Sequence, residues 1–337
     1  MKASGEEQAA PVPMATAALD AAEAASDPDA NRQPVEDELP APAEVATDLP
    51  LSFEEKDLPS LAPAPAIDPV DIVPAAMPSV RPRLLQAPPV APSVAIVIDD
   101  LGYNERAAHR LIAAGRPLTL AFLPISPNVA GQARSAAAAG MDVIVHMPME
   151  PLGRENPGRG AIRVGMPAES IEALVEAGLA AVPGAIGLNN HMGSKVTSDL
   201  ASMRPVMATL ARRGLFFLDS RTSGSSKAHA AALASGVPAI GRDVFLDNEV
   251  SFGAVMRQLQ ATERRARTRG YAVAIGHPHN TTIDALLAWM PEAEARGISL
   301  TTLKTLVPLD TCRQPIAQAR FDCSQIGVAA VAQAERH

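Results

Sequence analysis

Short apolar runs alternate with longer amphipathic or alanine-rich segments from residue 94 onward. The apolar runs predict buried strands over 94–98, 118–123, 142–145, 185–188, 215–218, 238–240, 271–275 and 298–303. The segments between them predict helices over 105–114, 128–139, 168–181, 199–213, 227–234, 251–269 and 283–290. Asp199 is a predicted N-cap, and the last of these helices can continue past Pro291 to residue 296.

The regular succession of strand and helix, with few hairpin signals, predicts a parallel sheet. Seven or eight such units within about 215 residues favour a closed or nearly closed (β/α) barrel. An open doubly wound sheet is the alternative. No G-x-G-x-x-G segment follows the first strand, which argues against a dinucleotide site.

Composition divides the chain into three parts. Residues 1–92 contain 17 of the 31 prolines, 16 acidic residues, five basic residues and a single aromatic residue, Phe53. Such a segment cannot bury enough apolar surface to offset its ordering entropy, so we predict a disordered acidic Pro-rich arm. Residues 93–311 form the predicted barrel domain and residues 312–337 a C-terminal tail. No Lys/Arg cluster is present, so we expect no nucleic-acid partner.

The sequence also bears on the compartment. No run of 18 apolar residues occurs, so no transmembrane segment is predicted in this chain, and no signal peptide is visible. Cys312 and Cys323 lie in a polar segment after the last predicted strand. A disulfide between them would imply an oxidising compartment, and two free thiols are the alternative. A long spacer before a catalytic domain often follows an anchor, so we expect a periplasmic or cell-envelope location.

Seven titratable side chains are predicted at the carboxyl ends of strands: Asp99 and Asp100 after the first, His146 after the third, His191 after the fourth, Asp219 after the fifth, and His277 and His279 after the seventh. In a parallel barrel these ends meet on one rim. Imidazoles and carboxylates together are the ligands of a catalytic zinc or a similar divalent ion. Such an ion would also offset the repulsion between two adjacent aspartates.

Each of these residues also has a structural interpretation. The aspartates can end a strand as solvated turn residues, and a single buried histidine can bond to a backbone carbonyl. Four of the seven histidines at one edge of the sheet nevertheless favour a functional site. Glu150, four residues after His146, can reach that site or lie solvated in a loop. Arg221 can pair with a carboxylate of the rim or lie on the surface.

Four segments resemble the divergent polysaccharide deacetylases, an offshoot of the carbohydrate esterases with the chitooligosaccharide-deacetylase fold: Ile-Asp-Asp-Leu-Gly at 98–102, Asn-His-Met-Gly-Ser at 190–194, Asp-Ser-Arg-Thr at 219–222 and Gly-His-Pro-His at 276–279. The resemblance extends over about 93–307. It implies a distorted (β/α)7-8 barrel of the polysaccharide deacetylase type. It also implies metal-dependent removal of an N- or O-acetyl group from a sugar polymer.

Carried over to this chain, the resemblance implies that Asp99 is the general base and Asp100 a metal ligand. His146 matches the first of two histidine ligands, but the second position, four residues later, is Glu150. His191, from the following strand, is the candidate for the missing imidazole. His277 matches the general acid, with His279 as the alternative.

The resemblance is incomplete in two other motifs. The Arg-Pro-Tyr-Gly and Asp-x-Asp-Trp motifs of the better-known branch are absent, so its oxyanion-hole tyrosine and acetyl-pocket tryptophan have no counterpart here. Ser194, Asp219, Arg221 and Glu150 are candidate substrate or supporting residues. A backbone N–H near Gly193 is expected to assist the metal in stabilising the oxyanion.

We therefore expect a metal-dependent hydrolase, with zinc as the expected ion, that removes acetyl groups from a polysaccharide or peptidoglycan-type N-acetylated sugar. The alternative is a non-catalytic glycan- or protein-binding cell-envelope protein on the same fold. The aromatic content of 3% favours this alternative, because sugar-binding clefts commonly use ring stacking. A third interpretation is a metal-dependent amidase or phosphoesterase. The sequence does not indicate the oligomeric state.

Overall fold

The computed structural model describes residues 91–324, so almost all of the arm predicted over 1–92 and the end of the predicted tail lie outside the described residues. Nine strands are present in the described part: β1 Ser93–Leu101, β2 Thr119–Phe122, β3 Asp142–Met149, β4 Gly187–Met192, β5 Phe216–Asp219, β6 Ala239–Gly241, β7 Val244–Phe245, β8 Tyr271–Gly276 and β9 Ser299–Thr301. Every pairing between them is parallel, as the alternating pattern predicts.

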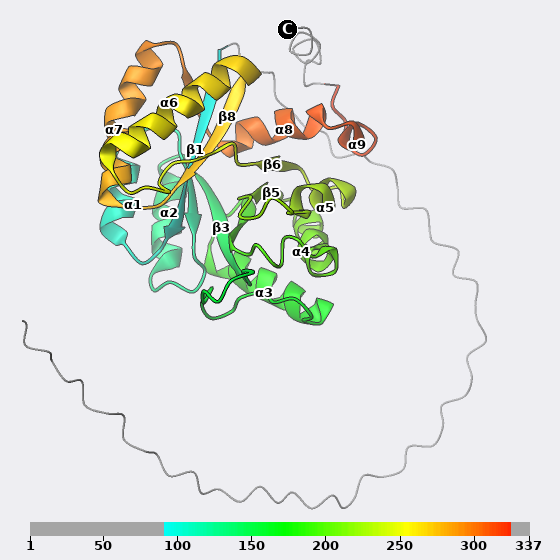
Figure 1. Cartoon of the computed structure of the whole chain (residues 1–337). Coiled ribbons are helices and arrows are strands. Elements are labelled where there is room, and N and C mark those ends of the chain that lie inside the picture. The colour runs from blue at the N-terminus through cyan, green and yellow to red at the C-terminus, as the bar shows by residue number, and fades with distance from the viewer. Residues whose placement is uncertain (1–90, 325–337) are drawn as a thin grey trace, which may run out of the picture. The chain divides into compact units, whose positions relative to one another are not determined.

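The sheet curls until its two ends nearly meet (Figure 1). Its strand order is β6-β5-β4-β3-β2-β1-β8-β7, and β9 pairs with the start of β1. β6 and β7 lie at opposite ends of this order, yet only Arg242 and Asp243 separate them in the chain. The Arg242 N–H donates to Asp219 O at 3.0 Å, and the Asp243 N–H donates to Val273 O at 2.8 Å. This two-residue link therefore spans the gap, and the fold is the predicted distorted (β/α) barrel.

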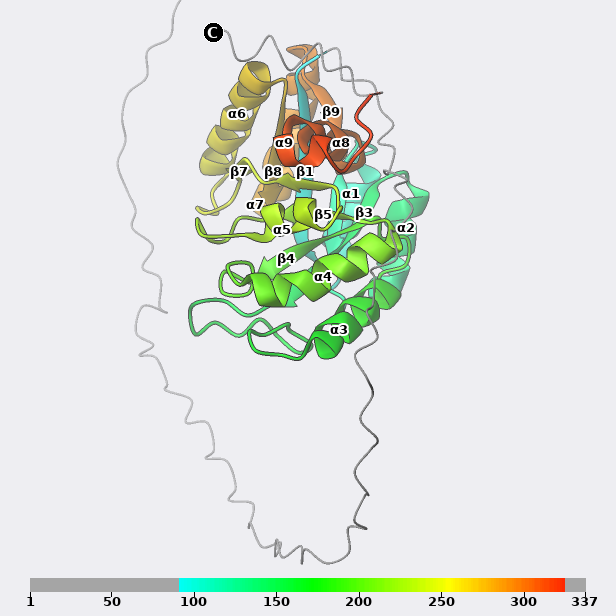
Figure 2. The same ribbon diagram turned by 90° about the vertical axis from the view of Figure 1, so that its right-hand side faces the viewer.

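Helices surround the sheet (Figures 1 and 2). They are α1 Glu105–Ala113, α2 Val129–Ala138, α3 Ala168–Ala181, α4 Leu200–Arg213, α5 Ala228–Ala234, α6 Phe252–Arg269, α7 Asn280–Ala295, α8 Leu303–Arg313 and α9 Pro315–Gln318. All seven predicted helices are present, with ends that differ by a few residues. The Asp199 carboxylate caps α4 by accepting from Ser202 N at 2.8 Å, and α7 continues through Pro291. Both features agree with the predictions.

Helix α8 was not predicted, because its internal Pro308 and mixed polarity gave no helical pattern. The last strand was predicted to run to residue 303, but β9 has three residues and α8 begins at Leu303. Apolar residues of α8, among them Leu306 and Val307, pack with interior side chains of the strands. The packed part of the chain also continues beyond the boundary predicted at residue 311, since Phe321 is buried in the main core.

A disulfide joins Cys312, near the end of α8, to Cys323. The two Cα atoms lie 5.8 Å apart. The bond ties the segment that follows α9 back to α8. Of the two alternatives left by the sequence, the structure has the disulfide.

The barrel interior changes from apolar to polar along several strands. Side chains at alternate positions form one apolar cluster with α8. In four strands the last interior apolar residue is followed two positions later by a polar residue: Val97 by Asp99, Ile144 by His146, Leu218 by Ser220 and Ile275 by His277. Because side chains alternate with a period of two, these polar groups continue the same interior rows at the carboxyl ends of the strands.

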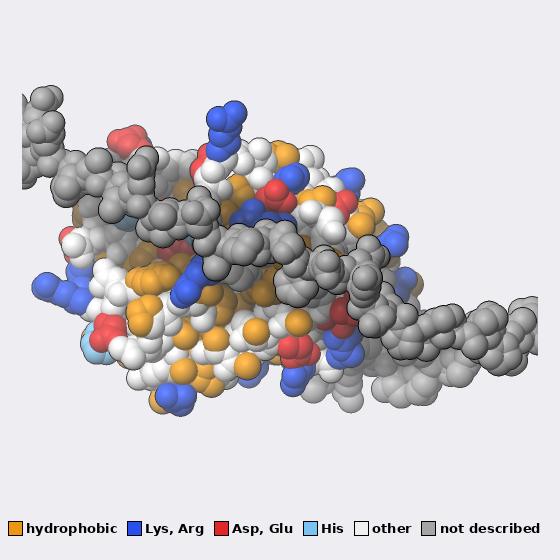
Figure 3. Space-filling view, turned by 90° about the horizontal axis from the view of Figure 1, so that it is seen from below, with side chains coloured by type: hydrophobic (Ala, Val, Ile, Leu, Met, Phe, Trp, Pro, Cys, Tyr) orange, Lys and Arg blue, Asp and Glu red, His pale blue; other side chains and the backbone are white. Residues whose placement is uncertain are grey.

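The outer surface carries mixed charge. Figure 3 shows one face of the molecule, on whose visible part basic, acidic and apolar side chains are interspersed. Within residues 91–324, no helix combines the length and the apolar character that crossing a bilayer requires.

Gly102 lets the chain turn sharply after the aspartates of β1. Its φ is +119°, and a Cβ at this position would lie 2.6 Å from Ser126 Cβ. We predict that Gly102→Ala lowers the free energy of unfolding by about 1–3 kcal/mol, measured by urea denaturation, because both the backbone conformation and the contact become unfavourable. Gly131→Ala is the control, since no atom lies near its added Cβ. Equal stability of the two variants would contradict the prediction.

Candidate active site

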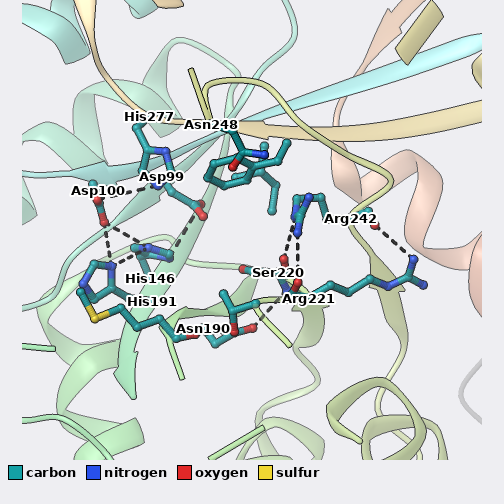
Figure 4. A pocket seen from close by; sticks show the side chains of 14 residues that line it. Asp99, Asp100, His146, Asn190, His191, Ser220, Arg221, Arg242, Asn248 and His277 are labelled. Carbon is teal, nitrogen blue, oxygen red and sulfur yellow. Dashed lines mark hydrogen bonds and ion pairs between the residues drawn. The ribbon is translucent and has the colours of Figure 1, made fainter. Parts of the chain in front are cut away.

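A pocket of about 440 Å³ opens at the carboxyl ends of the strands. It is lined by side chains from β1, β3, β4, β7 and β8 and from the loops that follow β5, β6, β7 and β8: Asp99, Asp100, His146, Asn190, His191, Met192, Ser220, Arg221, Thr222, Arg242, Phe245, Asn248, Ile275 and His277. Figure 4 shows Asp100, His146 and His191 together on one side and Arg221 and Arg242 on the other. The pocket therefore lies where parallel barrels commonly place their chemistry.

Both aspartates of β1 reach the pocket because the strand is irregular there. In a regular strand Asp99 and Asp100 would point to opposite faces. The register of β1 shifts between Ile98 and Leu101, and Asp100 takes a left-handed conformation with φ 55°. A bulge of this kind redirects one side chain, so both carboxylates face the same rim.

Two further pocket residues share this rare backbone conformation. Met192 ends β4 with φ 52°, and Arg221 follows β5 with φ 50°. Left-handed residues other than glycine cost about 1–3 kcal/mol each and concentrate at functional sites. Three of the four that occur among the described residues thus line one pocket.

Asp100, His146 and His191 form a compact triad. Asp100 Oδ1 lies 3.2 Å from His146 Nε2 and 2.8 Å from His191 Nδ1, and the two ring nitrogens are 3.1 Å apart. His146 is buried and His191 is half-buried. Each residue offers one ligand atom, and the three atoms lie within 4.8 Å of one another, as a metal site requires.

The surroundings of one buried oxygen of Asp100 indicate whether the triad suits a cation. Asp100 Oδ1 has no hydrogen-bond partner of acceptable geometry within residues 91–324, although two ring nitrogens lie beside it. A buried carboxylate oxygen without a donor is costly unless a cation faces it. Two imidazoles and one carboxylate are a common donor set for zinc and similar divalent ions, so the three residues fit such an ion.

Asn189 determines which nitrogen of His146 is available. Its Oδ1 accepts from His146 Nδ1 at 2.8 Å, and its Nδ2 donates to Asp99 Oδ1 at 2.9 Å and to Ser220 Oγ at 3.1 Å. Because an amide oxygen can only accept, His146 Nδ1 carries the proton. The lone pair of His146 Nε2 therefore faces Asp100 and His191, as a metal ligand needs.

The two adjacent aspartates differ in acidity. Burial raises the pKa of Asp99, and the neighbouring His146 and His277 offset this only in part. Burial would also raise the pKa of Asp100, but the neighbouring His146 and His191 outweigh it and hold that pKa well below its ordinary value. Asp100 therefore stays a carboxylate, whereas Asp99 binds a proton more readily.

His277 is held by a carboxylate that was not singled out in the sequence. Its Nδ1 lies 3.0 Å from Asp247 Oδ1, and its backbone N–H donates to Asp247 Oδ2 at 2.6 Å. Burial disfavours the imidazolium, but the hydrogen bond to Asp247 and the charge of Asp99 raise the pKa of His277 to about 9. Asp247 follows β7, whose two residues are too few to give a strand pattern.

Four sequence-predicted residues lie outside the pocket lining, namely Glu150, Ser194, His279 and Asp219. Glu150 accepts from Lys195 Nζ and Val164 N at 2.8 and 2.9 Å, so the structure does not bring it to the triad. Ser194 Oγ accepts from Leu152 N at 2.8 Å and stabilises the loop after β3. His279 is exposed and directly precedes α7. His191, and not Glu150, therefore lies beside Asp100 and His146.

Asp219 and Arg221 take different positions. Asp219 is buried below the rim, where its Oδ1 accepts from Arg221 N at 2.8 Å and its Oδ2 from Ser226 Oγ at 2.9 Å. Arg221 lines the pocket itself. Arg242 and Phe245, for which no sequence pattern indicated a role, also line it, because the link between β6 and β7 runs along the rim.

Comparisons with known proteins agree with this geometry. The sequence model of a family described as divergent polysaccharide deacetylase matches residues 96–307. The uncharacterized protein YibQ of Escherichia coli K12 is 39% identical over 60% of this chain, and the match spans 63% of that protein's length. An uncharacterized Haemophilus influenzae protein is 40% identical over 58% of this chain and 70% of its own length. The crystal structure of the uncharacterized protein ATU2773 from Agrobacterium tumefaciens C58 has 29% identity and a TM-score of 0.62, covering 64% of this chain and 89% of that one.

The triad makes a direct prediction for metal binding. With zinc as the probe ion, we expect His191→Ala to lower the affinity strongly, because the substitution removes a ligand atom. Loss of a residue that only supports a ligand lowers metal affinity by roughly 10–100-fold, and the loss in His191→Ala should be larger. Glu150→Gln is the matched control and should bind zinc as the parent does, since Glu150 pairs with Lys195. Calorimetry or competition with a chelator measures both affinities. Equal zinc affinity of the two variants would count against the triad.

The contact between Asp247 and His277 predicts a shift in titration. Asp247→Asn removes the carboxylate that favours the imidazolium, so the pKa of His277 should fall from about 9 toward its ordinary value of about 6.5. NMR titration of the His277 ring signals measures this shift. Asp284→Asn, which changes an exposed acid on α7, should leave the signals unchanged. An unaltered His277 titration in Asp247→Asn would refute the prediction.

Proposed function

Because this chain belongs to the divergent polysaccharide deacetylase family, we propose that it is a metal-dependent hydrolase that removes acetyl groups from a polysaccharide or peptidoglycan-type N-acetylated sugar. The observation that carries the proposal is the arrangement of one pocket. It combines a ligand triad, a buried carboxylate with a raised pKa and a histidine with a raised pKa. These are the parts that hydrolysis of an amide or ester needs.

Asp100, His146 and His191 are the residues that would hold the metal, and we propose zinc because of this donor set. A bound divalent ion would polarise the acetyl carbonyl and lower the pKa of a water molecule. Asn189 supports the triad by fixing the tautomer of His146.

Asp99 is the proposed general base. Asn189 holds its Oδ1, while Oδ2 accepts no hydrogen bond from the residues that the structure describes. The free oxygen can therefore accept the proton of the water that attacks the acetyl carbonyl. Its raised pKa makes it a stronger base than an exposed aspartate.

His277 is the proposed general acid. Its Nδ1 is engaged by Asp247, and its Nε2 lies 3.9 Å from Asp100 Oδ2, at the edge of the pocket. With a pKa of about 9 it is an imidazolium at neutral pH and can give the Nε2 proton to the leaving amine or alcohol. The acid and the base thus have separated pKa values, as the two tasks require.

A cell-envelope location remains part of the proposal. The disulfide between Cys312 and Cys323 supports it, because such bonds persist in oxidising compartments.

A non-catalytic binding protein is the second candidate. One observation favours it: apart from the histidines, Phe245 is the single aromatic side chain among the pocket-lining residues of the described chain, and sugar-binding clefts commonly use several rings. Binding of glycan or a protein partner by the metal-loaded protein without acetate release would support this candidate.

The proposed function predicts acetate release from N-acetylated chito-oligomers or peptidoglycan by the zinc-loaded protein. We expect Asp99→Asn to lower kcat by about 10²–10⁴-fold, because it removes the general base, and to leave the zinc content unchanged. Glu150→Gln should keep the activity of the parent. Full activity of Asp99→Asn would exclude its role as base, and zinc binding without any acetate release would favour the binding candidate.

A further inference from the structure

Two arginines with no carboxylate partner line the pocket across from the triad (Figure 4). Arg242 is half-buried, and its Nε donates to Ser220 O at 2.7 Å while its Nη2 donates to Arg221 O at 3.0 Å. Its guanidinium carbon lies 5.0 Å from the centre of the Phe245 ring. These contacts fix the guanidinium, and its remaining nitrogen, Nη1, donates to no acceptor within residues 91–324.

Arg221 is interlocked with Arg242. Its Nη1 donates to Arg242 O at 3.1 Å, so each arginine bonds to the backbone carbonyl of the other. The side chain lies directly against Gly241, where a Cβ would come within 2.5 Å of Arg221 Nε. The glycine therefore leaves room for the Arg221 side chain against the link that carries Arg242. The charge of Arg221 repels that of Arg242, and a shared anion would offset this repulsion.

Within residues 91–324, the two guanidiniums of the pocket have no carboxylate in contact with them. A divalent ion on the triad would compensate Asp99 and Asp100, and Asp219 and Asp243 would still act on Arg242 without contacting its guanidinium. No carboxylate of the described residues forms an ion pair with either of them. Burial and the neighbouring Arg221 lower the pKa of Arg242, and the charges of Asp99, Asp219 and Asp243 offset this only in part. A partly buried charge is costly when unpaired.

We propose that the substrate is an acetylated sugar that carries an oxyanion group, a carboxylate or a phosphate, and that Arg242 binds this group with Arg221 as a second cation. This inference rests on the proposed deacetylase function and adds the class of sugar to it. The planar guanidinium matches both kinds of oxyanion through paired N–H donors. The acetyl group then faces the triad while the anionic group lies across the pocket.

Three saccharides of equal length test the proposal: neutral diacetylchitobiose, a derivative with a carboxylate on the sugar and a derivative with a 6-phosphate. Calorimetry measures their binding to zinc-loaded Asp99→Asn, and acetate release measures kcat/KM with the parent. We expect at least one anionic saccharide to bind about 10–100-fold more tightly than the neutral one, as a charge-assisted contact implies. The better of the two identifies carboxylate or phosphate.

Substitutions then assign the preference to the arginines. Arg242→Gln should reduce the ratio of anionic to neutral binding to about one, and Arg221→Gln should reduce it less, since its side chain is exposed. Arg242→Lys keeps the charge but not the paired donors and should retain part of the ratio. Arg134→Gln, on the exposed face of α2, should retain all of it. Zinc content and thermal unfolding show whether each variant is folded.

The outcomes separate the two proposals. Acetate release by the parent, together with equal binding of neutral and anionic saccharides by zinc-loaded Asp99→Asn, overturns the anionic substrate and leaves the deacetylase function standing. An anionic preference that depends on Arg242, without acetate release from any saccharide, supports the anion site and overturns the deacetylase. An anionic preference that survives in Arg242→Gln overturns the assignment to this arginine. The comparison of anionic with neutral saccharides on protein that retains both arginines decides whether the substrate is anionic, even if an arginine variant fails to fold.

Discussion

Neighbouring side chains of a β-strand normally point to opposite faces of the sheet. This site depends on an exception to that alternation at the end of β1. The bulge after Ile98 and the left-handed conformation of Asp100 bring two adjacent carboxylates to one pocket. Gly102 then turns the chain away where no Cβ would fit. Since the two aspartates occupy different surroundings, one is buried beside an amide and the other lies between two imidazoles. Adjacent positions in the sequence thereby acquire different protonation properties.

Asn189 extends this arrangement across the barrel. It lies on β4 and contacts Asp99 on β1, His146 on β3 and Ser220 after β5. A single amide group, with one acceptor and two donors, thus connects Asp99, His146 and the far wall of the pocket. Because all three contacts are buried, each one restricts the geometry of the others. The site is organised by this network as well as by its titratable residues.

Much of the fold followed from the sequence because strands and helices of ordinary length leave strong patterns. The parallel barrel, the seven helices before residue 297 and the Asp199 cap are of this kind. The grouping of His146, His191 and Asp100 also followed, since parallel strands place their carboxyl ends together.

The parts that could not be predicted are those whose local pattern is weak. Strand β7 has two residues, so nothing indicated that Arg242, Phe245 and Asp247 would lie on the rim. Helix α8 contains a proline and has little amphipathic character, so its place under the barrel was not evident. No sequence pattern except its position at a strand end indicated a role for Asn189. The role of an amide group is evident only when its hydrogen-bond partners are known. Glu150 was a candidate site residue because it lies four residues after His146, but its carboxylate pairs with Lys195, which lies in a loop far away in the sequence.

The position of α8 has a consequence for how the domain acquires its structure. The first strand that lines the barrel interior begins at residue 93. The helix that packs at the opposite end of the barrel from the pocket, against the first residues of the strands, begins only at residue 303. During synthesis the apolar interior therefore stays exposed to water until almost the whole domain has been made. Contacts between residues so far apart in sequence form slowly, because a long loop must close before they are gained. The disulfide at the end of α8 then joins the last part of the chain to the element that completes the core.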